Sequence, residues 1–201
     1  MSKVQICNRA LSTYLGASRI NSLTEASPEA EQCNLHYDDT LQSLLEMHRW
    51  VFAKGRQILA VQVNDRVGEW GFKYARPSAA LKIHWVNDAE TARILMAQNM
   101  HPDAPRDVSQ TDIYSDVENA TCEFTKLITD TTKFPQYFAD ALSAALAANI
   151  AMPITEDIKR AQNAMSQAGD KLDMARVLDE EETPPLGYRT VPDYLTMRGV
   201  Y

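Results

Sequence analysis

The pattern of hydrophobic and polar positions is clearest between Ser27 and Ala53. Apolar, aromatic and histidine side chains recur there at steps of three, four or one, which traces one face of a helix. The start is marked as well, because Ser27 suits an N-cap and Pro28 suits the first helical position. The face consists of Cys33, Tyr37, Leu41, Leu44, Leu45, His48 and Phe52. The pattern predicts a helix of some 26 residues that ends in an aromatic core at Trp50 and Phe52.

A shorter stripe of the same kind precedes this helix. Its positions are Val4, Cys7, Leu11 and Leu15. Ser2 is a possible cap, and Gly16 fits the position just past the end of a helix. The first fifty residues are therefore predicted to form a helix hairpin.

After Gly55 the period changes from helical to alternating. Side chains alternate along Trp70–Tyr74 and Leu81–Trp85, as in strands with one buried face. Residues 89–99 fit a short helix. Ile113–Tyr114 and Thr121–Ile128 fit the two strands of a hairpin. The pattern predicts a small antiparallel β module with at least one long loop.

Helical spacing returns at Phe134, and Pro153 is expected to end that helix. Thr155 is expected to cap the next one. The last helix carries a heptad-like stripe at Ile158, Ala161, Met165, Ala168, Leu172 and Ala175. Such a stripe is typical of left-handed bundle packing. It either packs within its own subunit or faces, in part, another copy of the chain.

From Asp179 the chain turns acidic, then rich in proline and tyrosine. The segment is either a frayed terminus or a docked, extended arm. Its apolar content favours the arm, because a merely solvated tail is more polar. The residues predicted to bind a partner are Leu186, Tyr188, Val191, Tyr194, Leu195 and Tyr201.

These patterns together predict an α+β fold, an antiparallel helical bundle with an inserted small antiparallel β module and an extended C-terminal arm. The bundle comprises residues 1–53 and 131–178, the module residues 54–130 and the arm residues 179–201. The predicted structural core is Leu44, Leu45, Trp50, Phe52, Phe138 and Leu142.

Composition limits the class of protein. The 201 residues are 45% hydrophobic and 23% charged, which is ordinary for a soluble globular protein. No apolar run approaches the roughly 20 residues that span a bilayer. The N-terminus lacks the pattern of a signal peptide. The net charge of −7 argues against a nucleic-acid surface, which needs clustered Lys and Arg.

The chemistry-bearing residues form no recognisable site. The sequence has no Gly-rich phosphate loop, no H-E-x-x-H and no G-x-S-x-G. The three cysteines match neither a zinc site nor a disulfide framework, and we interpret them as reduced, buried thiols. Among the four histidines, His48 is expected in the core and His84 at the surface. We therefore predict no catalytic residue, cofactor or metal.

Several segments carry a resemblance to a known family. They are Cys7-Asn8-Arg9-Ala10-Leu11, Ser27-Pro28-Glu29-Ala30, His48-Arg49-Trp50-Val51-Phe52-Ala53 and Ile150-Ala151-Met152-Pro153-Ile154-Thr155. With them the chain resembles the tail tubular protein A family of short-tailed bacteriophages, also called head-to-tail adaptors or gatekeepers. The family often has Pro-Trp-Asn-Phe-Ala at the Trp50 segment, and a shorter link than Asn87–Ser109. The weak motifs extend over nearly the whole chain.

The resemblance implies a structural virion protein and no enzyme. Members form a ring, usually of twelve subunits, between the portal protein and the tail nozzle of the tubular protein B type. DNA passes through the lumen without specific binding, and no membrane is involved. The implied location is the virion tail, and the host cytoplasm during assembly.

Two other classes stay open from the residues alone. One is a non-catalytic helical module with a β insert that serves binding or regulation. The other is a hydrolase whose catalytic residues are too dispersed in the sequence to be recognised.

Overall fold

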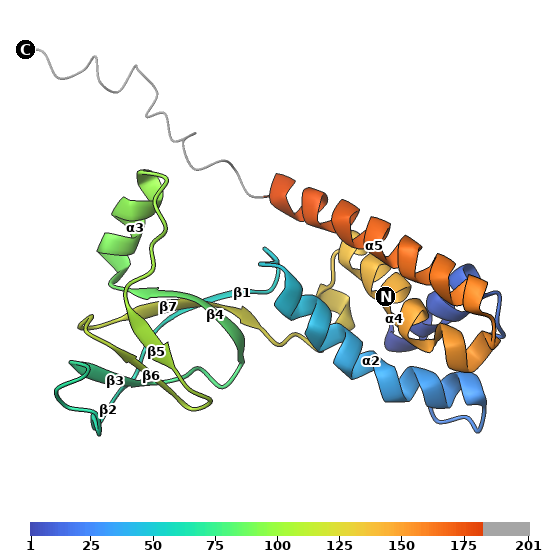
Figure 1. Ribbon diagram of the computed structural model, residues 1–201, viewed down its shortest axis with the longest axis horizontal. Coiled ribbons are helices and arrows are strands. Elements are labelled where there is room, and N and C mark those ends of the chain that lie inside the picture. Colours follow the sequence, from blue (N-terminus) through green and yellow to red (C-terminus); the bar gives the residue numbers. More distant parts are fainter. Residues whose placement is uncertain (183–201) are drawn as a thin grey trace, which may run out of the picture. The chain divides into compact units, whose positions relative to one another are not determined.

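The computed structural model describes residues 1–182. Over these residues the fold mixes five α-helices with two antiparallel sheets, which confirms the α+β class (Figure 1). The chain divides into two compact units. The helical unit contains Met1–Lys54 and Thr125–Glu182, and the β-rich unit contains Gly55–Phe124. The sequence pattern predicted the β module at residues 54–130.

The helical unit opens with α1 (Lys3–Arg9), which runs into the π-helical turn η1 (Ala10–Leu15). Ser2 caps α1 as predicted, and its hydroxyl accepts from the backbone of Gln5 at 3.2 Å. Gly16 ends the segment with a φ of +62°, a left-handed conformation that glycine adopts at little cost.

The second helix, α2 (Pro28–Met47), has the predicted cap at Ser27 but ends earlier than predicted. The expected continuation to Ala53 is wrong, because the backbone becomes extended at His48. The reason lies in Trp50, whose indole N–H donates to the Leu44 carbonyl at 2.8 Å. This bond satisfies a carbonyl that the end of the helix leaves unpaired. The tryptophan therefore folds back under the helix instead of extending it.

The prediction that Pro153 ends the next helix is wrong by two residues. After a short 3₁₀ turn, η2 (Thr131–Lys133), the helix α4 (Gln136–Thr155) contains Pro153 in its last turn. The Thr155 hydroxyl donates to the Ala151 carbonyl at 2.7 Å and supports this turn.

The cap of the last helix, α5 (Ile158–Glu181), is also not the one predicted. Asp157 is the N-cap and accepts from the backbone of Lys159 and Arg160, whereas Thr155 belongs to α4. Asp157 outcompetes Thr155 because its carboxylate binds two of the free N–H groups at the positive end of the helix.

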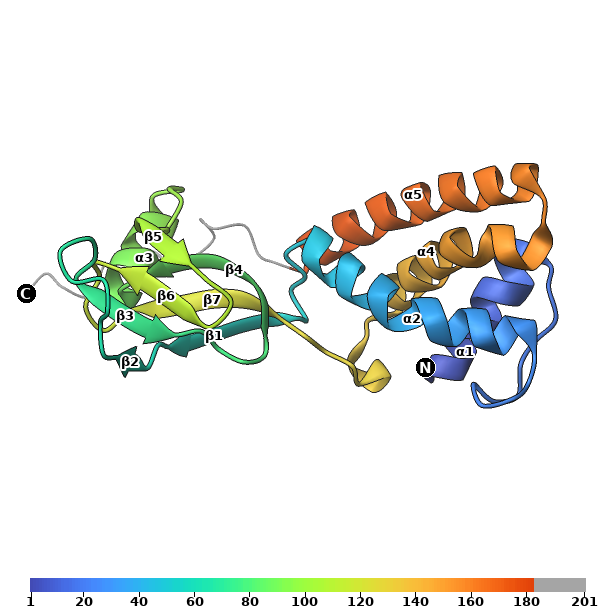
Figure 2. The same ribbon diagram turned by 60° about the horizontal axis from the view of Figure 1, so that its bottom comes forward.

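Helix α4 is the core of the helical unit, and it packs against α1, η1, α2 and α5 (Figure 2). It is apolar on nearly all sides. Within residues 1–182 it is long and apolar enough to cross a membrane by length and composition alone, which the sequence analysis did not expect. More than half of this stretch, 56%, is buried inside the protein, as in the core helix of a soluble protein.

The β-rich unit is built on two sheets. The first has the order β1-β7-β4 and the second the order β2-β3-β6-β5. The strands of the first are β1 (Lys54–Ile58), β7 (Thr121–Lys126) and β4 (Ala80–Asn87). The strands of the second are β2 (Val61–Gln62), β3 (Phe72–Ala75), β6 (Asp112–Ser115) and β5 (Arg106–Val108). A predicted short helix is confirmed as α3 (Ala89–Ala97), capped by Asp88.

The predicted hairpin of β6 with β7 is wrong. β6 pairs with β3 and β5, whereas β7 lies between β1 and β4 in the other sheet. The burial of β7 gives the reason, because its first five residues are all buried, including the polar ones. A strand covered on both faces and flanked on both sides is a central strand, not half of an exposed hairpin.

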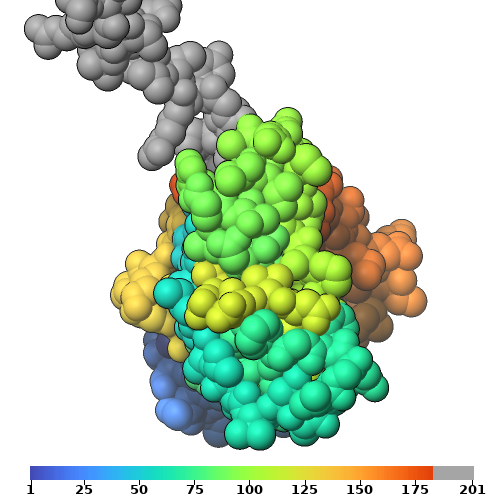
Figure 3. Space-filling view, turned by 90° about the vertical axis from the view of Figure 1, so that its left-hand side faces the viewer, coloured from blue at the N-terminus to red at the C-terminus, as the bar shows by residue number. Residues whose placement is uncertain are grey.

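Seven buried residues of the β-rich unit form one hydrophobic core cluster. It consists of Leu59, Tyr74, Val86, Ile113, Ala120, Cys122 and Phe124. Tyr74 joins the sheets, because its hydroxyl donates to the Val117 carbonyl at 2.5 Å and accepts from the Ala120 backbone at 3.4 Å. In the surface view, the α3 segment and the β2–β3 connection lie at opposite ends of the visible face (Figure 3).

Candidate interaction surface

The C-terminal end of α5 is fixed to the turn that follows α2. Asp179 is buried, with 1% of its surface exposed. Its carboxylate accepts from the Val51 backbone at 3.0 and 3.1 Å and from the Tyr137 hydroxyl at 2.8 Å. The His48 ring nitrogen Nε2 lies 3.3 Å from the same carboxylate. Asp179 therefore belongs to the helical unit, and its assignment to the arm was wrong.

Tyr137 is the donor in this network for a clear physical reason. Burial and the neighbouring Asp179 carboxylate raise the pKa of its phenol. A raised pKa keeps the proton on the hydroxyl, so the group can donate to the carboxylate at any ordinary pH.

Beside this network lies an aromatic cluster around Trp50, which is fully buried. Its ring meets Phe138 edge-on at 5.0 Å and His48 at 4.8 Å between ring centroids. Phe52 packs on Phe138 at 4.7 Å but is only half-buried. The other residues that the sequence placed in the core are buried, namely Leu44, Leu45, Phe138 and Leu142.

We expect Asp179→Ala to lower the free energy of unfolding by about 3 kcal/mol. The change leaves the half-buried Val51 N–H and Tyr137 hydroxyl without their acceptor, and donors that lose their partner away from bulk water are costly. Chemical denaturation followed by circular dichroism measures the loss. Asp173→Ala is the matched control, because Asp173 lies on the same helix with 77% of its side chain exposed. Equal effects of the two changes would contradict the role of the network.

A groove runs along the helical unit, with α4 as its floor and α2 and α5 as its walls. Its volume is about 220 Å³. It is lined by Thr40, Ser43, Leu44, Met47, Ala145, Ala148, Asn149, Met165, Ala168, Gly169 and Leu172. We call it the α2–α4–α5 groove. None of these residues is charged, and its two methionines are 56% (Met47) and 73% (Met165) exposed.

The groove exists because small residues face it. Ala145, Ala148 and Ala168 fill little space, and a Cβ added to Gly169 would meet nothing within 4 Å. A hydrogen bond of 2.8 Å from the Asn149 amide to the Thr40 hydroxyl links the floor to α2. The groove is thus an open, apolar surface between helices that are held in place elsewhere.

The heptad-like stripe of α5 is not buried as a unit. Ala175 is buried, whereas Ile158 and Met165 are 65% and 73% exposed. Met174 and Val177, outside the stripe, are exposed as well. Scattered exposed apolar residues are normal, but a concentration on one helix and its groove is typical of interaction sites.

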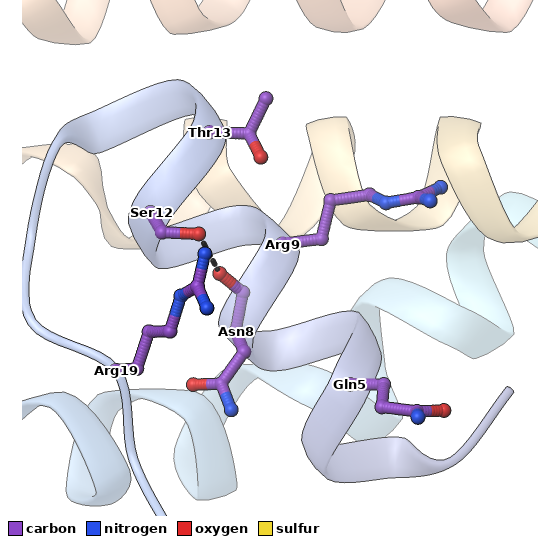
Figure 4. Close-up of a pocket in the computed structure, with 6 residues that line it drawn as sticks. All are labelled: Gln5, Asn8, Arg9, Ser12, Thr13 and Arg19. Carbon is purple, nitrogen blue, oxygen red and sulfur yellow. Dashed lines mark hydrogen bonds between the residues drawn. The ribbon is translucent and has the colours of Figure 1, made fainter.

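A polar pocket of about 320 Å³ lies at the other side of the helical unit, around η1. It is lined by Gln5, Asn8, Arg9, Ser12, Thr13 and Arg19 (Figure 4). Arg19 points toward Ser12 and Asn8, whereas Arg9 points toward α4 and pairs with Asp140. The Asn8 amide binds both backbone groups of Ile20 at 2.8 Å. Asn8 therefore holds the end of the 16–20 loop against α1, whereas Arg9 links α1 to α4.

In the β-rich unit, charged side chains support the sheet. The Arg56 guanidinium lies 2.9 Å from the buried Glu123 carboxylate and covers the Trp85 ring at 5.0 Å. Arg106 pairs with Asp103 next to β4. His84, expected at the surface, is half-buried. These contacts are structural, because each charged group neutralises another at the rim of the core.

The three cysteines are buried thiols. A hydrogen bond between Cys7 and Cys33 raises the pKa of the first and lowers the pKa of the second. Burial raises the pKa of Cys122 to about 11. Reactive cysteines are accessible thiolates, and none of the three thiols is accessible.

We therefore expect the native protein to resist thiol reagents. Ellman's reagent should detect about zero thiols per chain under native conditions and three in guanidinium chloride. The control is Val63→Cys, since Val63 is 91% exposed, and it should add one rapidly reacting thiol. A native cysteine that reacts as fast as this introduced one would contradict the burial.

The sequence-predicted binding residues cannot be placed on this surface. Leu186, Tyr188, Val191, Tyr194, Leu195 and Tyr201 lie outside the described residues. Among residues 1–182, no three His, Cys, Asp or Glu side chains are close enough to hold a metal ion. The groove itself was missed, because sequence periodicity marks the α5 stripe but not which of its residues stay uncovered.

Comparisons with known proteins add no assignment. No family model matches the chain, and no curated protein matches it.

Proposed function

We propose that this chain is a structural virion protein, an adaptor subunit that joins the portal of a short-tailed phage to the tail nozzle. The proposal starts from the sequence resemblance. The observation that carries it is the uncovered apolar surface of the helical unit, the α2–α4–α5 groove and the exposed residues of α5. Such a surface suits a protein that works by contact with other subunits.

In this proposal the helical unit is an antiparallel bundle around α4 and forms the body of each subunit. Copies of the chain assemble into a ring in the virion tail, with twelve subunits as is usual in the resembling family. The portal protein and the tubular protein B type nozzle bind at opposite faces. The acidic balance of the chain suits a channel that DNA passes without being held, because negative charge repels phosphates.

The direct test is assembly with the portal. The purified chain, mixed with portal rings, should give a larger particle by light scattering and an added ring by electron microscopy. Antibody against the chain should label the portal end of isolated tails. A chain that neither binds portal rings nor occurs in tails is not an adaptor.

We further propose that loops of the β-rich unit contact the nozzle. The segment 99–106 is not a free tip, because the Pro102 carbonyl accepts from the Asn87 amide at 2.9 Å and the Ala104 N–H donates to Val86. Deleting it would disturb β4, so a point change is the better test.

Met100→Glu is that change, since Met100 is 55% exposed just after α3. If the loop contacts the nozzle, the charge should weaken nozzle binding by about tenfold, the cost of one poorly placed charge in an interface. Val67→Glu is the control, since Val67 is 82% exposed and belongs to the β2–β3 connection, which lies at the opposite end of the visible face from α3 (Figure 3). Surface plasmon resonance measures the affinity of each variant for nozzle rings. Equal affinities for Met100→Glu and wild type would contradict the contact.

A further inference from the structure

Besides the pocket around η1, the helical unit has a second polar pocket, lined by Met1, Gln5, Arg9 and Gln136. The α2–α4–α5 groove differs in chemistry from both. Those pockets contain arginine, whereas every residue that lines the groove is uncharged. A ligand that enters the groove must give up water without a charged partner in return. The groove therefore suits an apolar, weakly charged segment, because burying a charge there would be costly.

The chain contains one segment of this character beyond the described residues. Residues 183–201 hold two arginines and one aspartate, a net charge of +1. Because the whole chain carries −7, residues 1–182 carry −8. The segment is thus attracted to the body of any copy of the chain, and its Leu and Tyr side chains match the apolar lining.

The length of residues 183–201 and the point at which they begin also suit binding in the groove. The described chain ends at Glu182, one residue past α5. The part of α5 that lines the groove lies 10 to 17 residues before this point, or about 15–26 Å along the helix. The 19 residues of the segment reach about 63 Å when extended. This is more than twice the distance back along α5 and leaves enough chain to cross to a neighbouring subunit.

We propose that the α2–α4–α5 groove is the docking site for residues 183–201 of a neighbouring copy of the chain. The inference rests on the proposed function, because the ring supplies the neighbour. Each subunit then offers its groove to one neighbour and its segment to the other. An interface made of two different surfaces is what a closed ring requires.

A cross-linking experiment with two full-length variants tests the site. One chain carries Met47→Cys at the groove and the other Tyr194→Cys in the segment. The natural cysteines are buried and give little background. Mixed and exposed to oxidised glutathione, the two chains should form a disulfide-linked heterodimer. Val63→Cys in place of Met47→Cys is the control, and it should give at most one tenth of the yield.

A second change shows whether the groove itself is needed. Gly169→Glu, in the Met47→Cys chain, places a carboxylate in open space at the groove and should lower the heterodimer yield at least tenfold. Gly169→Ala is the matched control and should leave the yield unchanged, because a Cβ there meets no atom within 4 Å. Circular dichroism checks that both variants are folded.

The outcomes separate the alternatives. No heterodimer above the Val63→Cys control, or equal yields with Gly169→Glu and Gly169→Ala, overturns the site. If a chain with both Met47→Cys and Tyr194→Cys forms only an internal disulfide, the segment covers its own groove and the neighbour is the wrong occupant. The experiment contains this chain alone, so a failure to bind portal rings would count against the proposed function and not against the docking site.

Discussion

Trp50→Ala should lower the free energy of unfolding by about 3–5 kcal/mol, the usual loss for a large aromatic side chain in a core. The change removes two stabilising contributions, the packing of the ring and a hydrogen bond. The fully buried ring leaves a cavity beside Phe138, and the Leu44 carbonyl loses the indole N–H that binds it at 2.8 Å. Because α2, the turn after it and α4 meet at this ring, the change should weaken the whole helical unit.

Urea denaturation followed by circular dichroism at 222 nm measures this loss. Trp70→Ala is the matched control, since Trp70 is the same side chain in a half-buried position of the β-rich unit. Trp50→Phe helps to separate the two contributions, because it removes the hydrogen bond but keeps a smaller aromatic ring, so its loss should lie below that of Trp50→Ala. A Trp50→Ala protein that unfolds within about 1 kcal/mol of wild type would show that the ring is not central to the core.

Removal of residues 183–201 should abolish ring formation on the portal while leaving the helical content of the subunit nearly unchanged. The five α-helices described all end by Glu181, so the deletion removes none of them. Tyrosines at 188, 194 and 201 are amphipathic anchors of the kind that dominate interfaces. Pro184, Pro185 and Pro192 lower the entropy cost of ordering the segment, because they restrict the free chain.

Electron microscopy of portal rings mixed with the shortened chain gives the readout. A full-length chain with Thr190→Ala and Thr196→Ala is the control, since it changes the segment at polar positions and keeps the apolar ones. If the shortened chain assembles on portals with wild-type affinity, the segment is a frayed end and not an arm.

Local signals predicted helix starts better than helix ends. Ser2 and Ser27 were recognised as caps because the bond each makes lies within three residues of it. The end of α2 depended on Trp50, whose helical spacing looked like a continuation although the ring turns back to Leu44. Similarly, Thr155 and Asp157 are both good caps, but Thr155 stays in the last turn of α4 and the Asp157 carboxylate binds the free N–H groups of α5.

The pairing of strands that are distant along the chain could not be predicted from the sequence. The alternation around Ile113 and Phe124 predicted strands, yet the strands belong to different sheets because each finds its partners far along the chain. The groove could not be predicted for the same reason. Ala148 and Gly169 were visible as small residues, but an open space between helices depends on where α2, α4 and α5 lie together.

The way the β-rich unit is inserted has a consequence for the order of folding. The helical unit comprises two chain segments that meet where the Lys126 N–H binds the Ala53 carbonyl at 2.8 Å. Closing a flexible loop of about 70 residues costs on the order of 4 kcal/mol of chain entropy. A β-rich unit that folds first, as one continuous segment whose ends run into the paired strands β1 and β7, removes most of this cost. We therefore expect the transition state for folding to contain β1 and β7, and changes there to slow folding more than changes in α5.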